Sequence, residues 1–231
     1  MDRVKKIAFL VSKPGLGNEG FLHHWREVHG PLVAGTPGYA DWRLRYVQNH
    51  ILGPAPLGKV FSFAGMAEFW LPGPSPNEDA FSATAIYQDR IASDERNFID
   101  MERTISFAAT EQVLIPGKGL IKVVVVSRKP DGSDHGQARE QLISAARPLA
   151  EMGLVGWRVD HVIAGTFRLP GAAHADPLQV DCMESLWFEN DSASKDYFAK
   201  AKKLRGQLFD PRDQIAFRAR EYVFHDILND P

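Results

Sequence analysis

Two apolar segments in distant parts of the chain end in the same way. The run from Lys5 to Ser12 is followed by Lys13-Pro14, and the run from Leu120 to Ser127 is followed by Arg128, Lys129 and Pro130. Apolar residues occupy both alternating faces of each run, which predicts a strand buried on both sides. Self-similarity at a long period is typical of a duplicated unit. The fold of one half therefore constrains the fold of the other.

Three further pairs of motifs occur in the same order in both halves. They are His50-Ile51 with His161-Val162, Trp70-Leu71 with Trp187-Phe188, and the segments 111–114 and 221–224, which both begin with glutamate. Chance accounts for one such pair more easily than for three in order, so we interpret the chain as a tandem repeat. The Gly/Pro segment from Pro116 to Gly119 is the natural boundary, which gives units of residues 1–116 and 117–231.

Hydrophobic periodicity predicts the same order of elements in each unit. The first has strands at 5–12, 42–52, 66–71 and 106–115, a helix at 18–29 that Gly30-Pro31 ends, and helices at 79–89 and 94–101. The second has strands at 120–127, 156–164, 182–188 and 215–224 and helices at 137–150 and 192–204. This βαββαβ order is that of a ferredoxin-like unit, whose sheet has one uncovered face. We expect an α+β fold in which two antiparallel sheets pack face to face as an α+β barrel, closed within one chain or between two chains.

The composition favours a folded, globular protein, and its charge points to no macromolecular partner. Of its residues 44% are hydrophobic, and 27 Lys+Arg nearly balance 29 Asp+Glu, which gives no basic surface for nucleic acid or an anionic membrane. No apolar run approaches the ~20 residues of a membrane span, and the apolar stretch at the N-terminus is too short for a signal peptide. The single cysteine, Cys182, cannot form an intrachain disulfide. We expect a cytoplasmic protein, with a homodimer left open.

Strand alternation groups polar and aromatic side chains on neighbouring strands. If the apolar residues Val47 and Ile51 face the helices, the opposite face looks into the barrel lumen. That face carries Tyr46, Gln48 and His50 on one strand and Glu68 and Trp70 on the next. On the helix at 18–29, Phe21, Trp25 and Val28 define the buried direction and His29 lies at its margin. We therefore expect His29 and His50 to converge with Glu68.

Two imidazoles in different surroundings can divide acid and base roles near neutral pH. We predict catalytic roles for His29, His50 and Glu68, with Glu68 orienting one imidazole, although each residue alone also fits a structural role. The predicted substrate contacts are Trp25, Tyr46, Gln48, Asn49 and Trp70. We predict no metal site, because His24 and His29 are five residues apart instead of the four that place two ligands on one helix face.

The same residues carry a family resemblance. The spaced residues Phe21, Trp25, His29 and Pro31, followed by the segments 46–50, 68–70, 94–98 and 111–114, resemble the EthD-like family of the dimeric α+β barrel superfamily over nearly all of residues 4–115. This resemblance implies a pocket between sheet and helices, usually without a cofactor. It also implies acid/base roles for His29 and His50. Relatives include cyclases, dehydratases, decarboxylases and lactone isomerases that act on polyketide-like or aromatic compounds.

The second unit departs from the pattern. Ala146 stands in place of His29, Leu142 in place of Trp25, and Asp160 in place of Asn49, while Ser185 takes the register of Glu68. We predict one active pocket, in the N-terminal unit. The predicted function is that of a cofactor-free lyase or isomerase, for dehydration, cyclisation or decarboxylation of an aromatic or polyketide-like molecule. The alternatives are a non-catalytic carrier of hydrophobic aromatic compounds, an accessory to an oxygenase, and a haem-binding protein.

Overall fold

Antiparallel strands form one closed barrel in the computed structural model, which describes residues 3–58, 63–76, 79–128, 134–166, 181–209 and 214–228. The order around the barrel is β1-β3-β2-β8-β5-β7-β6-β4. The strands are β1 (Arg3–Leu10), β2 (Arg45–Gly58), β3 (Gly65–Trp70), β4 (Ile105–Ile115), β5 (Ile121–Ser127), β6 (Gly156–Val162), β7 (Cys182–Phe188) and β8 (Ile215–Asp226). An α+β fold was expected, and this part of the prediction is confirmed.

The barrel closes within a single chain. Strand β2 pairs with β8, and β4 pairs with β6, so hydrogen-bonded ladders join the two halves at both edges. The expected α+β barrel is therefore present, and the strands of the two halves form one continuous sheet around it. Every strand edge is paired in such a barrel, which removes the open edges that invite aggregation.

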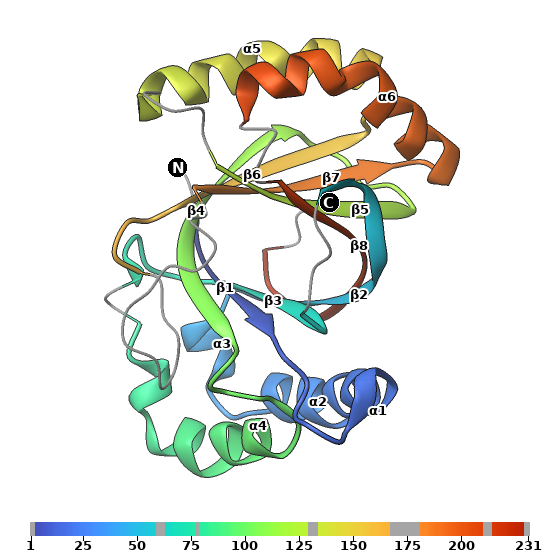
Figure 1. The fold of residues 1–231 in the computed structure, drawn as a ribbon. Coiled ribbons are helices and arrows are strands. Elements are labelled where there is room, and N and C mark those ends of the chain that lie inside the picture. The colour runs from blue at the N-terminus through green and yellow to red at the C-terminus, as the bar shows by residue number, and fades with distance from the viewer. Residues whose placement is uncertain are drawn as a thin grey trace.

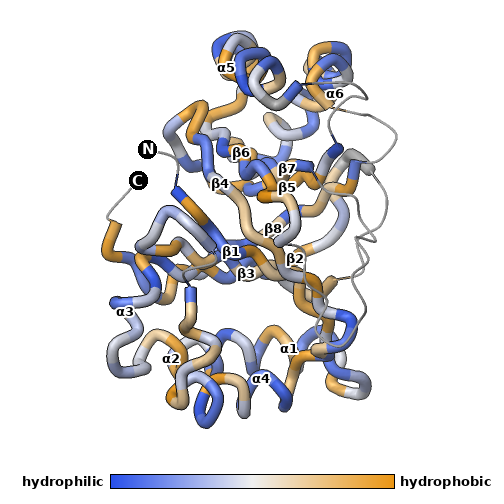
Figure 2. The backbone as a smooth tube through the Cα atoms, turned by 90° about the vertical axis from the view of Figure 1, so that its left-hand side faces the viewer, coloured by the Kyte–Doolittle hydropathy of each residue, from blue (hydrophilic) through white to orange (hydrophobic). Residues whose placement is uncertain are grey.

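Helices cover the barrel on two opposite sides (Figure 1). One layer comes from the N-terminal half and the other from α5 and α6, and the turned view in Figure 2 shows the same arrangement. The helical segments are α1 (Gly17–His24), η1 (Trp25–His29), α2 (Gly30–Ala34), α3 (Tyr39–Trp42), η3 (Phe81–Ala83), η4 (Tyr87–Ile91), α4 (Ala92–Phe98), α5 (His135–Glu151) and α6 (Asp191–Leu208). Among the helices that the structure describes, none has the length and apolar character needed to cross a membrane.

The first helix differs from its prediction in two ways. It continues through Pro31 to Ala34, because the π-turn η1 widens the helix and the Gly30 N–H donates to the Trp25 carbonyl oxygen five residues back. The extra residue in this turn also rotates the following side chains. Val28, expected in the core, is 45% exposed, whereas His29 is only 4% exposed.

The boundary between the halves is a close crossing of backbones. A Cβ atom on Gly117 would collide with the Val155 carbonyl oxygen, and one on Gly119 would collide with that of Phe188. Only glycine fits at such approaches. These glycines hold the connection from β4 to β5 against the ends of β6 and β7.

Candidate active site

The two faces of β2 are the reverse of those predicted. In the β2–β3 ladder Val47 lies opposite Glu68 and Gln48 opposite Ala67, and residues directly opposite share a face. Glu68 contacts charged groups inside the barrel, so Val47 and Asn49 face the lumen, and Gln48 faces the helices with Tyr46 and His50. The prediction failed because the lumen also holds a hydrophobic cluster, including Ile7, Phe9, Met66, Phe107 and Phe217. An apolar strand face can therefore point either into the lumen or toward the helices.

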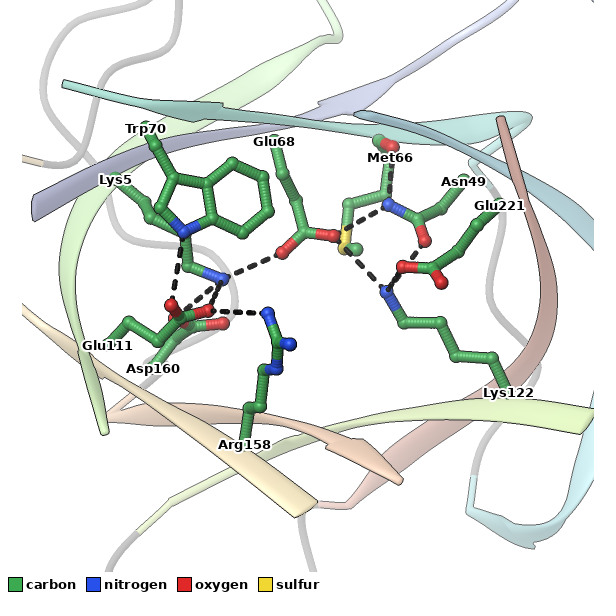
Figure 3. Close-up of polar contacts among 10 residues, drawn as sticks. All are labelled: Lys5, Asn49, Met66, Glu68, Trp70, Glu111, Lys122, Arg158, Asp160 and Glu221. Atoms are coloured by element: carbon green, nitrogen blue, oxygen red, sulfur yellow. Dashed lines mark hydrogen bonds and ion pairs between the residues drawn. The ribbon is translucent and has the colours of Figure 1, made fainter. Parts of the chain in front are cut away.

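Glu68 belongs to a polar network inside the barrel (Figure 3). Its Oε1 accepts a hydrogen bond from Lys5 Nζ at 2.8 Å, and its Oε2 accepts one from Asn49 Nδ2 at 2.8 Å and lies 3.2 Å from Lys122 Nζ. Trp70 Nε1 donates to Glu111 in the same network. Among the described residues Glu68 thus contacts no imidazole, and three predicted site residues, Glu68, Asn49 and Trp70, lie in the lumen.

Carboxylates outnumber cations in this network. Lys5 Nζ also lies 2.9 Å from Glu111 Oε1 and 2.8 Å from Asp160 Oδ1, while Lys122 Nζ lies 2.9 Å from Glu221 Oε1. Burial raises the pKa of Asp160 to about 7, and the neighbouring Glu111 and Glu68 add to this rise against the effect of Lys5. Burial also works to raise the pKa of Glu68, but Lys122 and Lys5 hold it well below its usual value. Asp160 is therefore the carboxyl group that carries a proton most readily here.

His50 is fixed between aromatic rings on the helix side of β2. Its ring stacks on Trp25 with centroids 5.0 Å apart, and its Nε2 lies 3.0 Å from Gln48 Oε1. The Gln48 amide in turn donates to the Trp25 carbonyl oxygen and to the Tyr46 hydroxyl. Burial, with the charges of Arg26 and Arg220, lowers the pKa of His50 to about 4. His50 is therefore neutral at pH 7 and held by its neighbours.

A cavity of about 680 Å³ lies between the N-terminal helices and the outer faces of β1, β3 and β4. Of the predicted site residues, His29 is the one on its wall. Aromatic side chains, Phe69 and Phe81 among them, make the wall suitable for a planar ring. The polar and charged residues of the wall include Lys6, His29, Tyr39, Arg43, Asp79, Tyr87 and Glu95.

His29 is oriented by a carboxylate. Its Nδ1 lies 2.9 Å from Asp94 Oδ2, and the other oxygen of Asp94 lies 2.9 Å from His24 Nε2. The hydrogen bond from His29 is the main reason that the pKa of Asp94 is lowered to about 2. A carboxylate on Nδ1 favours the tautomer whose Nε2 accepts a proton. Among the described residues, none lies within hydrogen-bond distance of that Nε2.

Sequence reasoning missed a second titratable pair on the cavity wall. The Tyr87 hydroxyl donates to Glu95, at 2.9 Å from Oε2. Glu95 as a residue is half-buried, but protein atoms surround its carboxyl group, and this burial raises its pKa. The segment 94–98 was recognised as a motif, yet its carboxylates were given no role. Tyr87 lies in the π-turn η4, as His29 lies in η1, and π-turns frequently occur at functional sites.

The cavity also has a cationic end. Arg43 binds Asp79 through two parallel hydrogen bonds of 2.9 Å, and Lys6 forms an ion pair with the same carboxylate. Burial works to raise the pKa of Asp79, but the hydrogen bonds from Arg43 lower it below its usual value. In the described ranges of the chain, no group of three or more His, Cys, Asp or Glu side chains could hold a metal ion.

The N-terminal half of the chain matches a known protein family. Residues 13–102 match the model of the EthD domain family. This half carries an EthD domain. The matched range includes His29, Asp94, Tyr87 and Glu95. A search of curated protein sequences gives no match.

Solved structures share the fold of the whole chain, EthD domain and C-terminal half together. An anthrone oxidase-like protein aligns with a TM-score of 0.59 at 11% identity, covering 98% of this chain and 95% of its own. A candidate monooxygenase from Lactobacillus acidophilus aligns with a TM-score of 0.56 at 10% identity, covering 96% of each chain. A candidate chlorite dismutase gives 0.52 at 10% identity, covering 96% and 95%. At these identities the likeness establishes the fold alone.

Proposed function

We propose that the chain is a cofactor-free acid/base enzyme whose His29 removes a proton from a carbon next to a carbonyl group. The substrate class we propose is an aromatic or polyketide-like small molecule. The observation that carries this proposal is the His29–Asp94 pair on the wall of an aromatic-lined cavity of about 680 Å³. A cavity of this size is typical of sites for small organic molecules.

The arrangement supports a dehydration or another lyase or isomerase step. His29 Nε2 takes the C–H proton, and Asp94 stabilises the resulting imidazolium through Nδ1. The electron pair of the C–H bond moves into an enolate and then expels a hydroxyl group. Glu95, on the same cavity wall and with a pKa that burial raises, supplies the proton with which the hydroxyl leaves as water. We assign His50 and Glu68 to holding the sheet, because their partners lie outside the cavity wall.

A second candidate is oxidation by molecular oxygen. The solved structures of similar fold include an anthrone oxidase-like protein and a candidate monooxygenase, and these names favour chemistry with oxygen in this fold. The first step is the same, because a base that forms a stabilised carbanion also forms a species that O₂ can oxidise. A CH₂ group and one O₂ then give a carbonyl group and one water.

We also propose that residues 1–116 and 117–231 are two ferredoxin-like units, of which only the first holds a site. The order of strands and helices supports this proposal. So does the lumen, where Lys5 lies over Trp70 at 4.4 Å and pairs with Glu111. Lys122 likewise lies over Trp187 at 4.9 Å and pairs with Glu221.

The test is hydrogen–deuterium exchange at the CH₂ group of anthrone, an enolisable aromatic ketone, measured under argon. We expect His29→Gln to slow the enzyme-dependent exchange by about 10²- to 10⁴-fold, the usual contribution of a general base. His23→Gln is the control, since His23 is exposed on the same helix. Equal exchange in all three proteins would refute the role of His29. Oxygen uptake in air, with formation of a quinone, would assign the oxidative outcome.

A further inference from the structure

The cationic end of the cavity contains a buried hydroxyl group without a partner. Tyr39 is 2% exposed and lines the cavity, and no described residue lies within hydrogen-bond distance of its hydroxyl oxygen. Its ring packs edge-on against Phe81, at 5.7 Å, and His225, at 5.3 Å, which fixes its position. A buried hydroxyl without a hydrogen bond costs free energy, so its presence at a cavity wall points to a ligand.

Two cations, Arg43 and Lys6, line the same cavity as Tyr39. Arg43 follows Tyr39 by one helical turn, and the Arg43 N–H donates to the Tyr39 carbonyl oxygen. Lys6 and Arg43 share the single carboxylate of Asp79, which leaves one positive charge in excess. Burial raises the pKa of Tyr39 well above its usual value, so the hydroxyl keeps its proton and acts as a donor.

Aromatic side chains connect Tyr39 with the acid/base groups of the cavity wall. The Tyr87 hydroxyl donates to Glu95, and the Tyr87 ring packs edge-on against Phe81 at 5.4 Å, the same ring that Tyr39 contacts. The Arg43 guanidinium stacks over Phe81 at 5.0 Å, which extends the flat wall toward Tyr39. A planar ring in the cavity could thus meet His29 with one edge and Tyr39 with another.

We propose that Tyr39, Arg43 and Lys6 bind an anionic oxygen, a carboxylate or phenolate, carried by an aromatic ligand of this cavity. The proposal rests on the proposed function, because it specifies the substrate class of the same site. Tyr39 donates one hydrogen bond to the anionic oxygen, and the excess positive charge neutralises it. This end of the cavity then selects anionic over neutral aromatic compounds and places the ring against His29.

The test compares 2-naphthoate with 2-naphthamide, which has the same ring and a neutral amide in place of the carboxylate, by titration calorimetry. We expect the unaltered protein to bind the naphthoate more tightly, and Tyr39→Phe to weaken it about tenfold or more, as for a hydrogen bond to a charged group. Tyr39→Phe should leave the melting temperature unchanged or higher, because the lost hydroxyl had no protein partner.

The charge is tested separately. We expect Lys6→Met to weaken naphthoate binding several-fold, whereas Lys200→Met, the same charge change on exposed α6 across the barrel, should leave it unchanged. Equal affinity for the two compounds, equal effects of the two lysine substitutions, or unaltered naphthoate affinity in Tyr39→Phe would each overturn the proposal. Binding is also measured in His29→Gln. If His29→Gln loses anthrone exchange but still prefers the naphthoate, this subsite is separate from the catalytic base. If the unaltered protein shows normal exchange but no preference for the naphthoate, the subsite is refuted and the proposed function stands.

Discussion

The two helix layers cover the same barrel in different ways. The N-terminal layer encloses a cavity of about 680 Å³ with titratable groups on its wall. The C-terminal layer is a packed core, in which Trp157, Leu186 and Phe188 of the sheet and Tyr197 of α6 are fully buried. The fold itself therefore needs no cavity, and the space in the first half is a property of its side chains.

Polar groups show the same difference. In the C-terminal layer Arg205 binds Glu184 with two hydrogen bonds, of 3.0 and 2.6 Å, and Trp157 Nε1 donates to the same carboxylate at 3.0 Å. Both oxygens of Glu184 and two of the three guanidinium nitrogens of Arg205 are thus bonded within the layer; Arg205 Nε has no described partner, but Arg205 does not line the cavity. In the N-terminal layer, His29 Nε2 and the Tyr39 hydroxyl have no described partner. A satisfied polar group supports the fold, and an unsatisfied one at a cavity supports binding.

The sharpest test of this difference is the removal of Arg205. Arg205→Met leaves the Glu184 carboxylate buried without its cation, which should cost about 3–5 kcal/mol of unfolding free energy. Urea denaturation measures this loss, and naphthoate affinity of the folded fraction should not change. The double variant Arg205→Met/Glu184→Leu should regain much of the stability. A loss below about 1 kcal/mol in the single variant would contradict the structural role.

Disruption of the His29–Asp94 pair in the N-terminal layer should affect the reaction more than the stability of the fold. Asp94→Asn removes the carboxylate that orients His29, and we expect anthrone exchange to fall about 10- to 100-fold. Because the pKa of Asp94 is lowered to about 2, it stabilises the fold above about pH 4, and this contribution is lost as the pH falls toward 2. The stability of the Asp94→Asn variant should therefore fall less between pH 4 and pH 2 than that of the unaltered protein. Asp41→Asn, at an exposed site, is the control.

The sequence predicted the sheet well and the site only in part. Apolar runs located the strands, because a strand buried on both faces needs them whatever the topology. The same property hid which face of β2 looks inward, and so His50 and Glu68 were placed together although they lie on opposite sides. The sequence shows which face of a strand looks inward only when one face is polar and the other is apolar.

The site residues that the sequence did not predict were missed for a different reason. Tyr87 and Glu95 lie in a segment that was expected as two regular helices, and Tyr39 lies in a short helix that was not predicted. The π-turns rotate side chains away from the positions that a 3.6-residue period gives. The cavity is built by tertiary packing of these segments on β1, β3 and β4, for which local periodicity holds no signal.

One substitution made in both layers can test whether only the first has space. Ala8→Leu adds volume at the cavity wall, and we expect it to weaken naphthoate binding more than tenfold with little change in stability. Ala216→Leu adds the same volume to the packed layer, where overpacking should cost about 1–3 kcal/mol. Calorimetric titration and urea denaturation of both variants give the comparison. Equal stability losses would mean that the two layers are packed alike.

The barrel interior is where the two halves meet, and Asp160 stands there in place of Asn49. Because burial raises the pKa of Asp160 to about 7, the folded protein keeps a proton that the unfolded chain has already released above about pH 4. The stability that this proton provides is complete below pH 4 and is lost as the pH rises through 7. Asp160→Asn makes the two positions alike and removes this dependence, so its stability relative to the unaltered protein should increase from pH 5 to pH 8. Urea denaturation at pH 5, 6, 7 and 8 measures the stability of both proteins. If their difference in stability does not change with pH, the proton lies on another carboxylate of the network and not on Asp160.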